Sequence, residues 1–439
     1  MLEAAPSANL KGTIKVPGDK SISHRAIMLG GLSVGHTHIT GLLEGEDVLA
    51  TAAALSAMGA TVTKQDDGSW IVDGVGLGGL REPDDILDMG NSGTAARLLM
   101  GVLAGQKMTC FMTGDASLRS RPMMRVATPL ESMGATFTSR DGMRLPLCLI
   151  GTDTPLAIEY KLPVASAQVK SAILLAGLSA IGKTTVIEDK PTRDHTERML
   201  THFGGEIEVI PLDTGGNRIT VTGQPELSAA DLIVPADPSS AAFPTVAALI
   251  TKNSSITLTG VGQNETRTGL YTTLIEMGAD ITFENERIEG GEPIADIIIK
   301  SSDLKGVDVP SGRAPSQIDE YPILAIAAAF AAGKTTLHGI GELRVKECDR
   351  LSAVVAGLRA NGVEVEEGAD WMIIHGTNAN VPGGGMVKTH IDHRIAMSFL
   401  VMGLAAQKSV KIDDASPIDT SFPNFKELMT SLGANFPRS

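Results

Sequence analysis

The sequence is short of aromatic residues, of cysteine and of positive charge, and each shortage argues against a class of protein. Aromatic residues make up 3% of the chain, and the net charge is −14. A surface that binds nucleic acid needs clustered Lys and Arg and aromatic platforms for the bases, so no nucleic-acid partner is predicted. The three cysteines are widely spaced and odd in number. They do not predict a disulfide framework and are typical of a reducing, cytoplasmic compartment.

Long hydrophobic runs and a targeting signal are also missing. No apolar run reaches the roughly 18 residues of a membrane span. The opening "MLEAAPSANLKG" lacks the basic and apolar pattern of a signal peptide. We therefore expect a cytoplasmic protein without a membrane partner, and nothing in the first ten residues predicts an ordered element. At 439 residues with 43% hydrophobic content, the chain favours two globular domains.

One short pattern, a helix that ends in glycine and is followed by a strand, recurs six times. Examples are "LSAMGATVT" and "LESMGATFT", and the copies are spaced 70 to 84 residues apart. Glycine after a helix supplies the left-handed C-cap conformation, and the alternating tail predicts a strand. The six glycines are Gly59, Gly134, Gly204, Gly278, Gly362 and Gly433.

A second pattern recurs in step with the first. It has a polar opening residue, about ten apolar or small residues, a stop that contains glycine, and a β-rich segment. A helix that is apolar on nearly every side is buried, and Ser, Asn and Asp are good N-caps for it. The opening residues are Ser21, Asn91, Ser166, Ser239, Asp319 and Asp392.

The two patterns together divide the chain into six units of roughly 73 residues, which predicts an α/β fold of three plus three units. "VPGDKS" near Asp19 is echoed by "VPADPSS" near Asp237. We interpret these two segments as the places where the chain passes between domains, which gives one domain of residues 19–235 and another of residues 1–18 plus 236–439. A stacked solenoid is the alternative, but solenoid repeats are usually shorter, at about 20–45 residues.

Two motifs suggest other chemistry, but neither predicts a site. "GLSAIGKT", Gly177–Thr184, matches a phosphate-binding loop, but that loop follows a strand and opens a helix, whereas here a helix pattern comes first. The stretch is predicted to be a helix-to-strand turn. The histidines near residues 36–38 and 390–393 lack a further convergent carboxylate or thiol, so no metal site is predicted.

The starts of the buried helices carry the residues that suggest a functional site. Lys20, Arg25 and Arg394 stand in these first turns beside the Ser, Asn and Asp caps. Helix N-termini attract anions, so several of them together with cationic side chains predict an anion site. Each cap alone is better explained by helix capping. In "LRVKECDRL", Lys346 and Arg350 repel each other at i,i+4, and a shared anionic ligand would explain their spacing.

Eight motifs together resemble the 5-enolpyruvylshikimate-3-phosphate synthase family, in particular its class II branch. They are "GDKSISHR", "GNSGTAAR", "GDASLRSRPM", "SAQVKSAILLAGL", "TRDHTE", "IDEYPILAIAAA", "RVKECDRL" and "DHRIAM". The resemblance implies two similar domains, each of three βαβαββ-type repeats with buried helices, hinged by two crossings around an active-site cleft. It also implies transfer of the enolpyruvyl group of phosphoenolpyruvate to the 5-hydroxyl of shikimate 3-phosphate, without a metal or an organic cofactor. We expect a monomer whose partners are these two small molecules.

The resemblance also implies roles for residues that match the family motifs. Asp319 would be the base for the 5-hydroxyl and Glu347 the proton donor and acceptor at carbon, with Lys20 assisting and contacting both substrates. The other residues implied to bind shikimate 3-phosphate are Ser21, Arg25, Ser166, Ala167, Gln168, Arg193 and Lys346, beside Asp319. The other residues implied to bind phosphoenolpyruvate are Asn91, Gly93, Arg121, Gln168, Arg350 and Arg394.

Three positions affect how closely the resemblance holds. Gly93 leaves space in the implied phosphoenolpyruvate site, which predicts sensitivity to the mimic glyphosate. Thr420 precedes "SFP" where some members have lysine, and Cys348 stands where serine is common. The sister enzyme that uses UDP-N-acetylglucosamine commonly has a reactive cysteine in the loop matching "GDASLRSRP", and residues 111–147 have none. A non-catalytic scaffold would not need Asp319 and Glu347 at such positions.

Overall fold

The computed structural model describes residues 1–213 and 215–437, which form two compact units. The terminal unit comprises Met1–Asp19, Pro235–Ile288 and Glu292–Ser439, and the central unit comprises Lys20–Val234 with Glu289–Gly291. Each unit has a hydrophobic core of its own. The chain passes from one unit to the other within three residues of Asp19 and Asp237, where the echoed segments stand, and again on either side of Glu289–Gly291.

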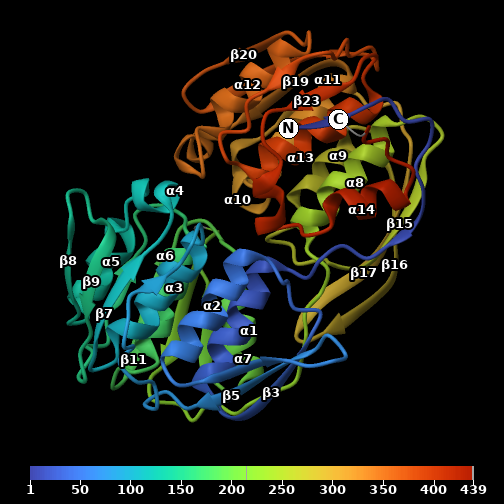
Figure 1. The fold of residues 1–439 in the computed structure, drawn as a ribbon. Helices are drawn as coiled ribbons and strands as arrows, with labels where there is room; N and C mark the ends of the chain where they lie inside the picture. Colours follow the sequence, from blue (N-terminus) through green and yellow to red (C-terminus); the bar gives the residue numbers. More distant parts are fainter. Residues whose placement is uncertain (214, 438–439) are drawn as a thin grey trace. The chain divides into compact units, whose positions relative to one another are not determined.

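The six predicted buried helices are present, and each begins within two residues of its predicted opening residue. Within the central unit, α1 and α6 both pack against α3. Within the terminal unit, α8, α11 and α13 pack against one another (Figure 1). Nearly every residue of these helices is buried, as a helix that is apolar on all sides requires. Their bounds are α1 Lys20–Leu32, α3 Gly93–Ala104, α6 Ala167–Gly177, α8 Pro238–Ile250, α11 Tyr321–Phe330 and α13 His393–Ala405.

A second helix in each repeat ends at one of the predicted glycines. All six glycines have positive φ, between 79° and 109°, so the predicted C-cap conformation is confirmed. These helices are α2 Glu46–Ala57, α5 Met124–Ser132, α7 His195–His202, α9 Gly269–Glu276, α12 Arg350–Ala360 and α14 Phe425–Ser431. The shorter helical segments are α4 Ala116–Ser120, α10 Ala314–Gln317, η1 Ser311–Arg313, η2 Gly341–Val345 and η3 Ser416–Thr420.

The strands form one small sheet per repeat, and each sheet combines one parallel pair with an antiparallel pairing. In the central unit the strand orders are β14-β3-β5-β4, β6-β7-β9-β8 and β10-β11-β13-β12. The strands are β3 Val34–Thr40, β4 Thr61–Lys64, β5 Trp70–Val75, β6 Leu87–Asp88, β7 Thr109–Thr113, β8 Thr136–Arg140, β9 Arg144–Ile150, β10 Glu159–Lys161, β11 Lys183–Glu188, β12 Ile207–Pro211, β13 Asn217–Thr222 and β14 Leu232–Ile233.

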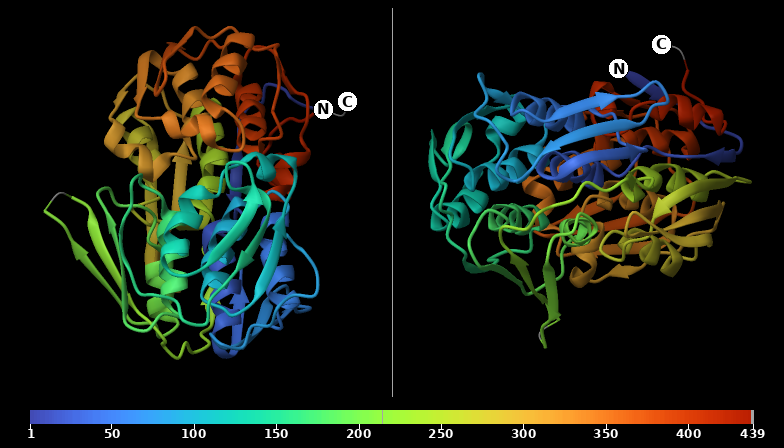
Figure 2. Two further views of the ribbon diagram at one scale, coloured as in Figure 1. Left: turned by 90° about the vertical axis from the view of Figure 1, so that its left-hand side faces the viewer. Right: turned by 90° about the horizontal axis from the view of Figure 1, so that it is seen from below.

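The terminal unit repeats this arrangement. Its strand orders are β16-β17-β15-β2, β18-β19-β21-β20 and β1-β23-β22. The strands are β1 Leu2–Ala4, β2 Lys11–Ile14, β15 Ser255–Gly262, β16 Asp280–Glu289, β17 Glu292–Lys300, β18 Asp308–Val309, β19 Ala332–His338, β20 Val365–Glu367, β21 Trp371–Thr377, β22 Met386–Val387 and β23 Val410–Ile412. Within each unit the strands lie outside the buried helices (Figure 2). The α/β fold class is therefore confirmed.

Three strands come from outside the repeat that they complete. β14, after the third repeat, pairs in parallel with β3 of the first. β2 pairs in parallel with β15, and β1 pairs antiparallel with β23. The first fourteen residues thus supply one strand to each of two sheets of the terminal unit. Of these strands, β1 lies within the first ten residues, where nothing predicted an ordered element.

The motif that resembles a phosphate-binding loop is a turn, as predicted. Helix α6 ends at Gly177 and strand β11 begins at Lys183, so the order of elements is the reverse of a phosphate loop. Over the described residues, no helix combines the length and hydropathy that crossing a membrane would need.

Candidate functional site

In the central unit the residues of "GDKSISHR" lie at the start of α1. Lys20 is the first residue of that helix, and its ammonium forms an ion pair with the carboxylate of Asp47 in α2. Asp47 is buried, whereas about a fifth of the Lys20 side chain is exposed. Asp47 therefore holds the Lys20 cation at the helix N-terminus. The ammonium group and the partial positive charge of the helix can then attract the same anion.

Arg25, one turn further along α1, is buried and fixed by three hydrogen bonds. Its Nε donates to Thr196 Oγ1 at 2.7 Å, its Nη1 to Ser21 O at 2.8 Å and its Nη2 to Ser171 Oγ at 2.8 Å. Thr196 lies in α7 and Ser171 in α6, so one guanidinium ties three helices together. Arg193, also predicted, is half-buried two residues before α7 begins.

The start of α6 is linked to α3 through Gln168. Ser166 caps α6 by accepting a hydrogen bond from Val169 N at 3.4 Å, and Ala167 is the first helical residue. Gln168 Nε2 donates to Thr94 Oγ1 at 3.0 Å, and its Oε1 accepts from Arg97 Nη1 at 2.8 Å. The side chain of Gln168 is thus held between two helix starts, with Arg97 as a cation that the sequence reasoning missed.

Asn91 and Arg121 form the third cluster of the central unit. Arg121 Nη2 donates to Asn91 Oδ1 at 2.9 Å and to Ser117 Oγ at 3.0 Å, and Asn91 Nδ2 donates to Asp115 Oδ2 at 2.6 Å. Asp115 also caps α4 through Leu118 N. The two predicted residues are therefore in direct contact, and a carboxylate orients the amide between them.

Gly93 stands where a larger residue would collide with cationic side chains. A Cβ atom at this position would lie 2.9 Å from Nη1 of Arg97 and 3.2 Å from Nη1 of Arg121. Both atoms are the ends of long side chains, so a methyl group would displace the two guanidinium groups rather than the backbone.

The central unit also contains a buried ion cluster that sequence reasoning missed. Lys170 in α6 is fully buried, with Nζ 2.7 Å from Glu197 Oε1 and 3.3 Å from Glu188 Oε2. Glu188 also accepts hydrogen bonds from the backbone N–H and hydroxyl of Thr192. Burial raises the pKa of Glu197 although Lys170 opposes the shift. The cluster fixes the segment that leads to Arg193.

In the terminal unit the predicted carboxylates surround one arginine. Arg350 begins α12 and is 1% exposed; its Nη2 lies 2.6 Å from Glu347 Oε2, and its Nη1 lies 3.3 Å from Asp319 Oδ1. Asp319 Oδ1 is also 3.4 Å from Lys346 Nζ. Four predicted residues from two segments, 346–350 and the one around Asp319, therefore meet at one point.

Asp392, the N-cap of α13, completes the shell around Arg350. Its Oδ2 accepts from Arg350 Nε at 2.7 Å, and its Oδ1 accepts from Arg394 N at 2.8 Å. Burial alone would lower the pKa of the Arg350 guanidinium, but Asp392, Glu347 and Asp319 together raise it. Arg350 is thus a permanent cation whose contacts can be exchanged only for other anions.

A second arginine, Arg267, lies in the same unit and has no motif to signal it. It is 2% exposed, and its Nη1 and Nη2 lie 2.7 Å from Asp19 Oδ2 and 2.9 Å from Asp237 Oδ1. Its Nη2 also donates to Ser239 Oγ at 2.9 Å, and Ser239 Oγ in turn donates to Glu320.

Arg394 joins the two arginine clusters. Its Nη1 donates to Asp319 O at 3.0 Å and lies 3.5 Å from Glu320 Oε1. A continuous polar chain therefore runs from Arg267 through Glu320 and Arg394 to Asp319. The predicted residues form a cationic, hydroxyl-rich set in the central unit and a mixed carboxylate and guanidinium set in the terminal unit.

Cys348 should be a poor nucleophile despite its position beside Glu347. Its Sγ lies 3.6 Å from Asp392 Oδ2, and burial followed by the Asp392 charge raises the pKa of the thiol in spite of Arg350. Because the thiolate is scarce at pH 8, alkylation by iodoacetamide is expected at least about tenfold more slowly than for an unhindered thiol. Mass spectrometry of the labelled peptide measures it, with the same protein in denaturant as control. Rapid labelling of folded Cys348 at pH 8 would contradict this.

Comparison with known proteins gives one consistent result. The EPSP synthase (3-phosphoshikimate 1-carboxyvinyltransferase) family matches residues 4–429. A protein of Paramagnetospirillum magneticum named 3-phosphoshikimate 1-carboxyvinyltransferase is 62% identical over 99% of this chain and 97% of its own length. One of the same name from Rhodospirillum rubrum is 60% identical over 99% and 97%. The solved structure of EPSP synthase from Acinetobacter baumannii is 47% identical, with a TM-score of 0.89 over 99% of each chain.

Proposed function

Because this chain belongs to the EPSP synthase family, we propose that its two sets of site residues divide the work of one enolpyruvyl transfer. The activity of the chain is that of a 3-phosphoshikimate 1-carboxyvinyltransferase: it transfers the enolpyruvyl group of phosphoenolpyruvate to the 5-hydroxyl of shikimate 3-phosphate and releases phosphate. This step serves aromatic amino acid biosynthesis.

Binding of shikimate 3-phosphate is assigned mainly to the central unit. Lys20, at the N-terminus of α1, and the fixed guanidinium of Arg25 offer charge-assisted hydrogen bonds to phosphate and carboxylate oxygens. The start of α6 supplies a second helix N-terminus. The full set is Lys20, Ser21, Arg25, Ser166, Ala167, Gln168 and Arg193, with Asp319 and Lys346 from the terminal unit.

Binding of phosphoenolpyruvate is assigned to arginines of both units. Arginine binds carboxylate and phosphate through two parallel hydrogen bonds, and Arg121 is already oriented for this by Asn91 and Ser117. The full set is Lys20, Asn91, Gly93, Arg121, Gln168, Arg350 and Arg394.

Arg350 belongs to the phosphoenolpyruvate set and also contacts both proposed catalytic carboxylates. These contacts are the observation that supports the catalytic roles of Asp319 and Glu347. Asp319 and Glu347 both neutralise the same buried guanidinium. An incoming substrate anion at Arg350 replaces one of these contacts, which leaves a carboxylate able to accept a proton. Substrate binding and activation of the base are thereby coupled at one side chain.

The reaction then proceeds by addition and elimination. Asp319 removes the proton of the 5-hydroxyl as its oxygen attacks C2 of phosphoenolpyruvate. Glu347, which takes up a proton from solvent once a substrate anion replaces it at Arg350, delivers this proton to C3. The product of this step is a tetrahedral ketal phosphate. Glu347 next removes a proton from C3, the C2–O bond to phosphate breaks, and the double bond re-forms. Lys20 stabilises negative charge on the phosphate oxygens, and two carboxylates in one cationic site can be held in opposite protonation states.

Phosphate release tests this function directly. Purified protein is mixed with phosphoenolpyruvate and either shikimate 3-phosphate or UDP-N-acetylglucosamine as acceptor. Release is expected with shikimate 3-phosphate alone. Release with the nucleotide sugar alone would show that shikimate 3-phosphate is the wrong acceptor. Release with neither acceptor, from folded protein, would favour a binding scaffold.

The space at Gly93 predicts sensitivity to glyphosate and its loss on Gly93→Ala. The added methyl group would push Arg97 and Arg121 from the positions that hold Gln168 and Asn91. A misplacement of about 1 Å can cost up to about 100-fold. We therefore expect the KM for phosphoenolpyruvate and the glyphosate concentration for half-inhibition each to rise by about 10- to 100-fold. Steady-state kinetics measures both.

Gly78→Ala is the matched control, because a Cβ at Gly78 meets no atom within 4 Å and its backbone has no positive φ. Its kinetics should equal those of the wild type. A wild-type inhibition curve that stays flat into the millimolar range would contradict the assignment of Gly93.

The protein is further proposed to act as a cytoplasmic monomer. The three cysteines are free thiols, which suits a reducing compartment. Each unit has its own core, so no second copy is needed to bury apolar surface. Light scattering of the purified protein should give a mass near 45.8 kDa.

A further inference from the structure

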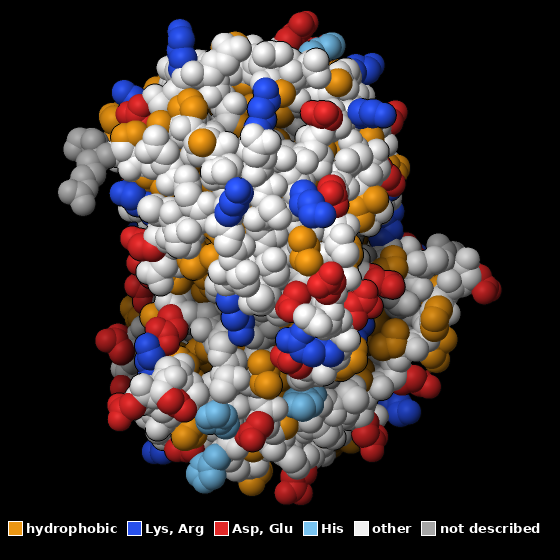
Figure 3. Space-filling model, turned by 90° about the vertical axis from the view of Figure 1, so that its right-hand side faces the viewer, with side chains coloured by type: hydrophobic (Ala, Val, Ile, Leu, Met, Phe, Trp, Pro, Cys, Tyr) orange, Lys and Arg blue, Asp and Glu red, His pale blue; other side chains and the backbone are white. Residues whose placement is uncertain are grey.

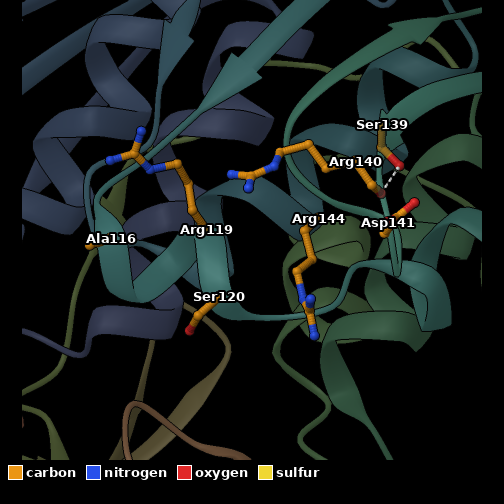
Figure 4. Close-up of a pocket in the computed structure, with 7 residues that line it drawn as sticks. All are labelled: Ala116, Arg119, Ser120, Ser139, Arg140, Asp141 and Arg144. Atoms are coloured by element: carbon orange, nitrogen blue, oxygen red, sulfur yellow. Dashed lines mark hydrogen bonds between the residues drawn. The ribbon is translucent and has the colours of Figure 1, made fainter.

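A hollow in the central unit, apart from the residues assigned above, is lined by arginine. Its walls are the short helix α4 and the hairpin of β8 and β9, and its volume is about 960 Å³ (Figure 4). A volume of this order suits a small molecule rather than a single ion. The lining residues are Ala116, Arg119, Ser120, Ser139, Arg140, Asp141 and Arg144.

The charges of this hollow are not balanced. Within residues 1–213 and 215–437, no carboxylate lies within ion-pair distance of Arg119, Arg140 or Arg144, and Asp141 is the one acidic residue of the lining. Arg119 Nε does donate to the backbone oxygen of Asp115 at 3.3 Å. The chain carries a net charge of −14, and acidic side chains are scattered over the face drawn in Figure 3. Three arginines without ionic partners in one place therefore stand out in a chain of this net charge.

The directions of the three side chains indicate how many anionic groups would bind. In Figure 4 the side chain of Arg140 extends toward Arg119, whereas Arg144 points elsewhere. Ser120 and Ser139 already donate their hydroxyls to backbone oxygens, at 2.7 Å and 3.0 Å. A ligand would therefore be bound by the guanidinium groups, which prefer phosphate and carboxylate. Because these groups point in at least two directions, the ligand would carry at least two anionic groups.

The walls of the hollow are held in register by the backbone. Met123 N donates to Met143 O at 2.7 Å and joins the segment after α4 to the turn of the hairpin. On the other side Asp115 caps α4 through Leu118 N at 2.7 Å. The arginines therefore project from a frame that is built without a ligand.

We propose that this hollow is an accessory binding site for a small molecule that carries two or more phosphate or carboxylate groups. It lies outside the set assigned to the two substrates, since none of its lining residues belongs to that set. No aromatic residue lines it, which disfavours a nucleic acid strand as its occupant.

Titration calorimetry with inorganic pyrophosphate at low ionic strength tests the proposal. The double variant Arg140→Gln/Arg144→Gln should bind pyrophosphate at least about tenfold more weakly than the wild type. Its melting temperature should not fall, because both side chains are exposed and unpaired with any described carboxylate. The control Lys161→Gln/Arg218→Gln removes two exposed cations of the same unit and should bind like the wild type. Inorganic phosphate, with one anionic group, should bind at least about tenfold more weakly than pyrophosphate.

Arg121→Gln separates this site from the substrate set. Pyrophosphate binding should persist in Arg121→Gln and be at least about tenfold weaker in Arg140→Gln/Arg144→Gln. The reverse pattern would place the ligand at the substrate arginines and overturn the proposal. Equal binding by all variants, or none by the wild type, would overturn it too. None of these results depends on turnover, so the accessory site and the transferase assignment can fail separately.

Discussion

An Asp319→Asn enzyme is expected to turn over about 10³ times more slowly than the wild type at saturating substrates. A positioned general base contributes about 10²- to 10⁴-fold, and asparagine cannot accept the proton of the 5-hydroxyl. The substitution keeps the shape of the side chain. It replaces one carboxylate oxygen beside Lys346 and Arg350, which lie 3.4 Å and 3.3 Å away, with an amide group. Phosphate release under saturating conditions measures the loss.

The result has to be separated from damage to the terminal unit. Asp308→Asn removes a carboxylate of the same unit whose partner is His338, and the side chains of Asp308 and His338 are 76% and 46% exposed. This control should keep full activity. Urea unfolding should place Asp319→Asn within about 1 kcal/mol of the wild type, since the Arg350 cation keeps Asp392 and Glu347. A variant that retained more than a tenth of wild-type turnover would move the role of base from Asp319 to another group, with Glu347 the next to test.

The parts of the fold that follow local rules could be predicted from the sequence. Gly59 and its five counterparts have positive φ because only a residue without Cβ ends a helix in that way at low cost. The buried helices were predicted because a helix that is apolar on every side can lie only inside the protein. Both signals are contained in about fifteen consecutive residues.

Long-range strand pairing could not be predicted in this way. β1 has three residues, and its partner β23 lies about 400 residues further along the chain. β14 has two residues and completes the sheet of β3. Such short strands carry no periodic signal. They become ordered by pairing with a strand that lies far away in the sequence, which the local sequence does not reveal.

The same limit separates the site residues that were predicted from those that were missed. Lys20, Asn91, Ser166, Asp319 and Arg394 were found because they stand at the starts of helices with a visible pattern. Arg267 and Lys170 were missed, since each owes its importance to partners elsewhere. Arg267 and Asp19 are 248 residues apart. The nearest available signal was the echo of "VPGDKS" in "VPADPSS", which marks the two aspartates that Arg267 joins.

Arg267→Met is expected to lower the free energy of unfolding by about 3–5 kcal/mol. Removing one member of a buried ion cluster leaves the others charged and without compensation, and that is the cost measured for such changes. Here the remaining groups are Asp19 and Asp237, whose side chains are 2% and 7% exposed. Burial opposes the charge on Arg267, but Asp19 and Asp237 raise the pKa of its guanidinium, so it cannot adapt by losing its proton. Urea unfolding, monitored by circular dichroism, measures the change.

Two further variants make this result specific to the buried cluster. Arg359→Met removes an exposed arginine of the same unit, 3.7 Å from Glu367, and should cost less than about 1 kcal/mol. Arg267→Lys keeps the charge but cannot span both aspartates, so its stability should fall between that of Arg267→Met and that of the wild type. If Arg267→Met were as stable as Arg359→Met, the two crossing segments would be held by their backbone contacts instead. Those contacts are the hydrogen bonds from Asp19 N to Pro235 O and from Asp237 N to Pro17 O, at 2.8 Å and 2.9 Å.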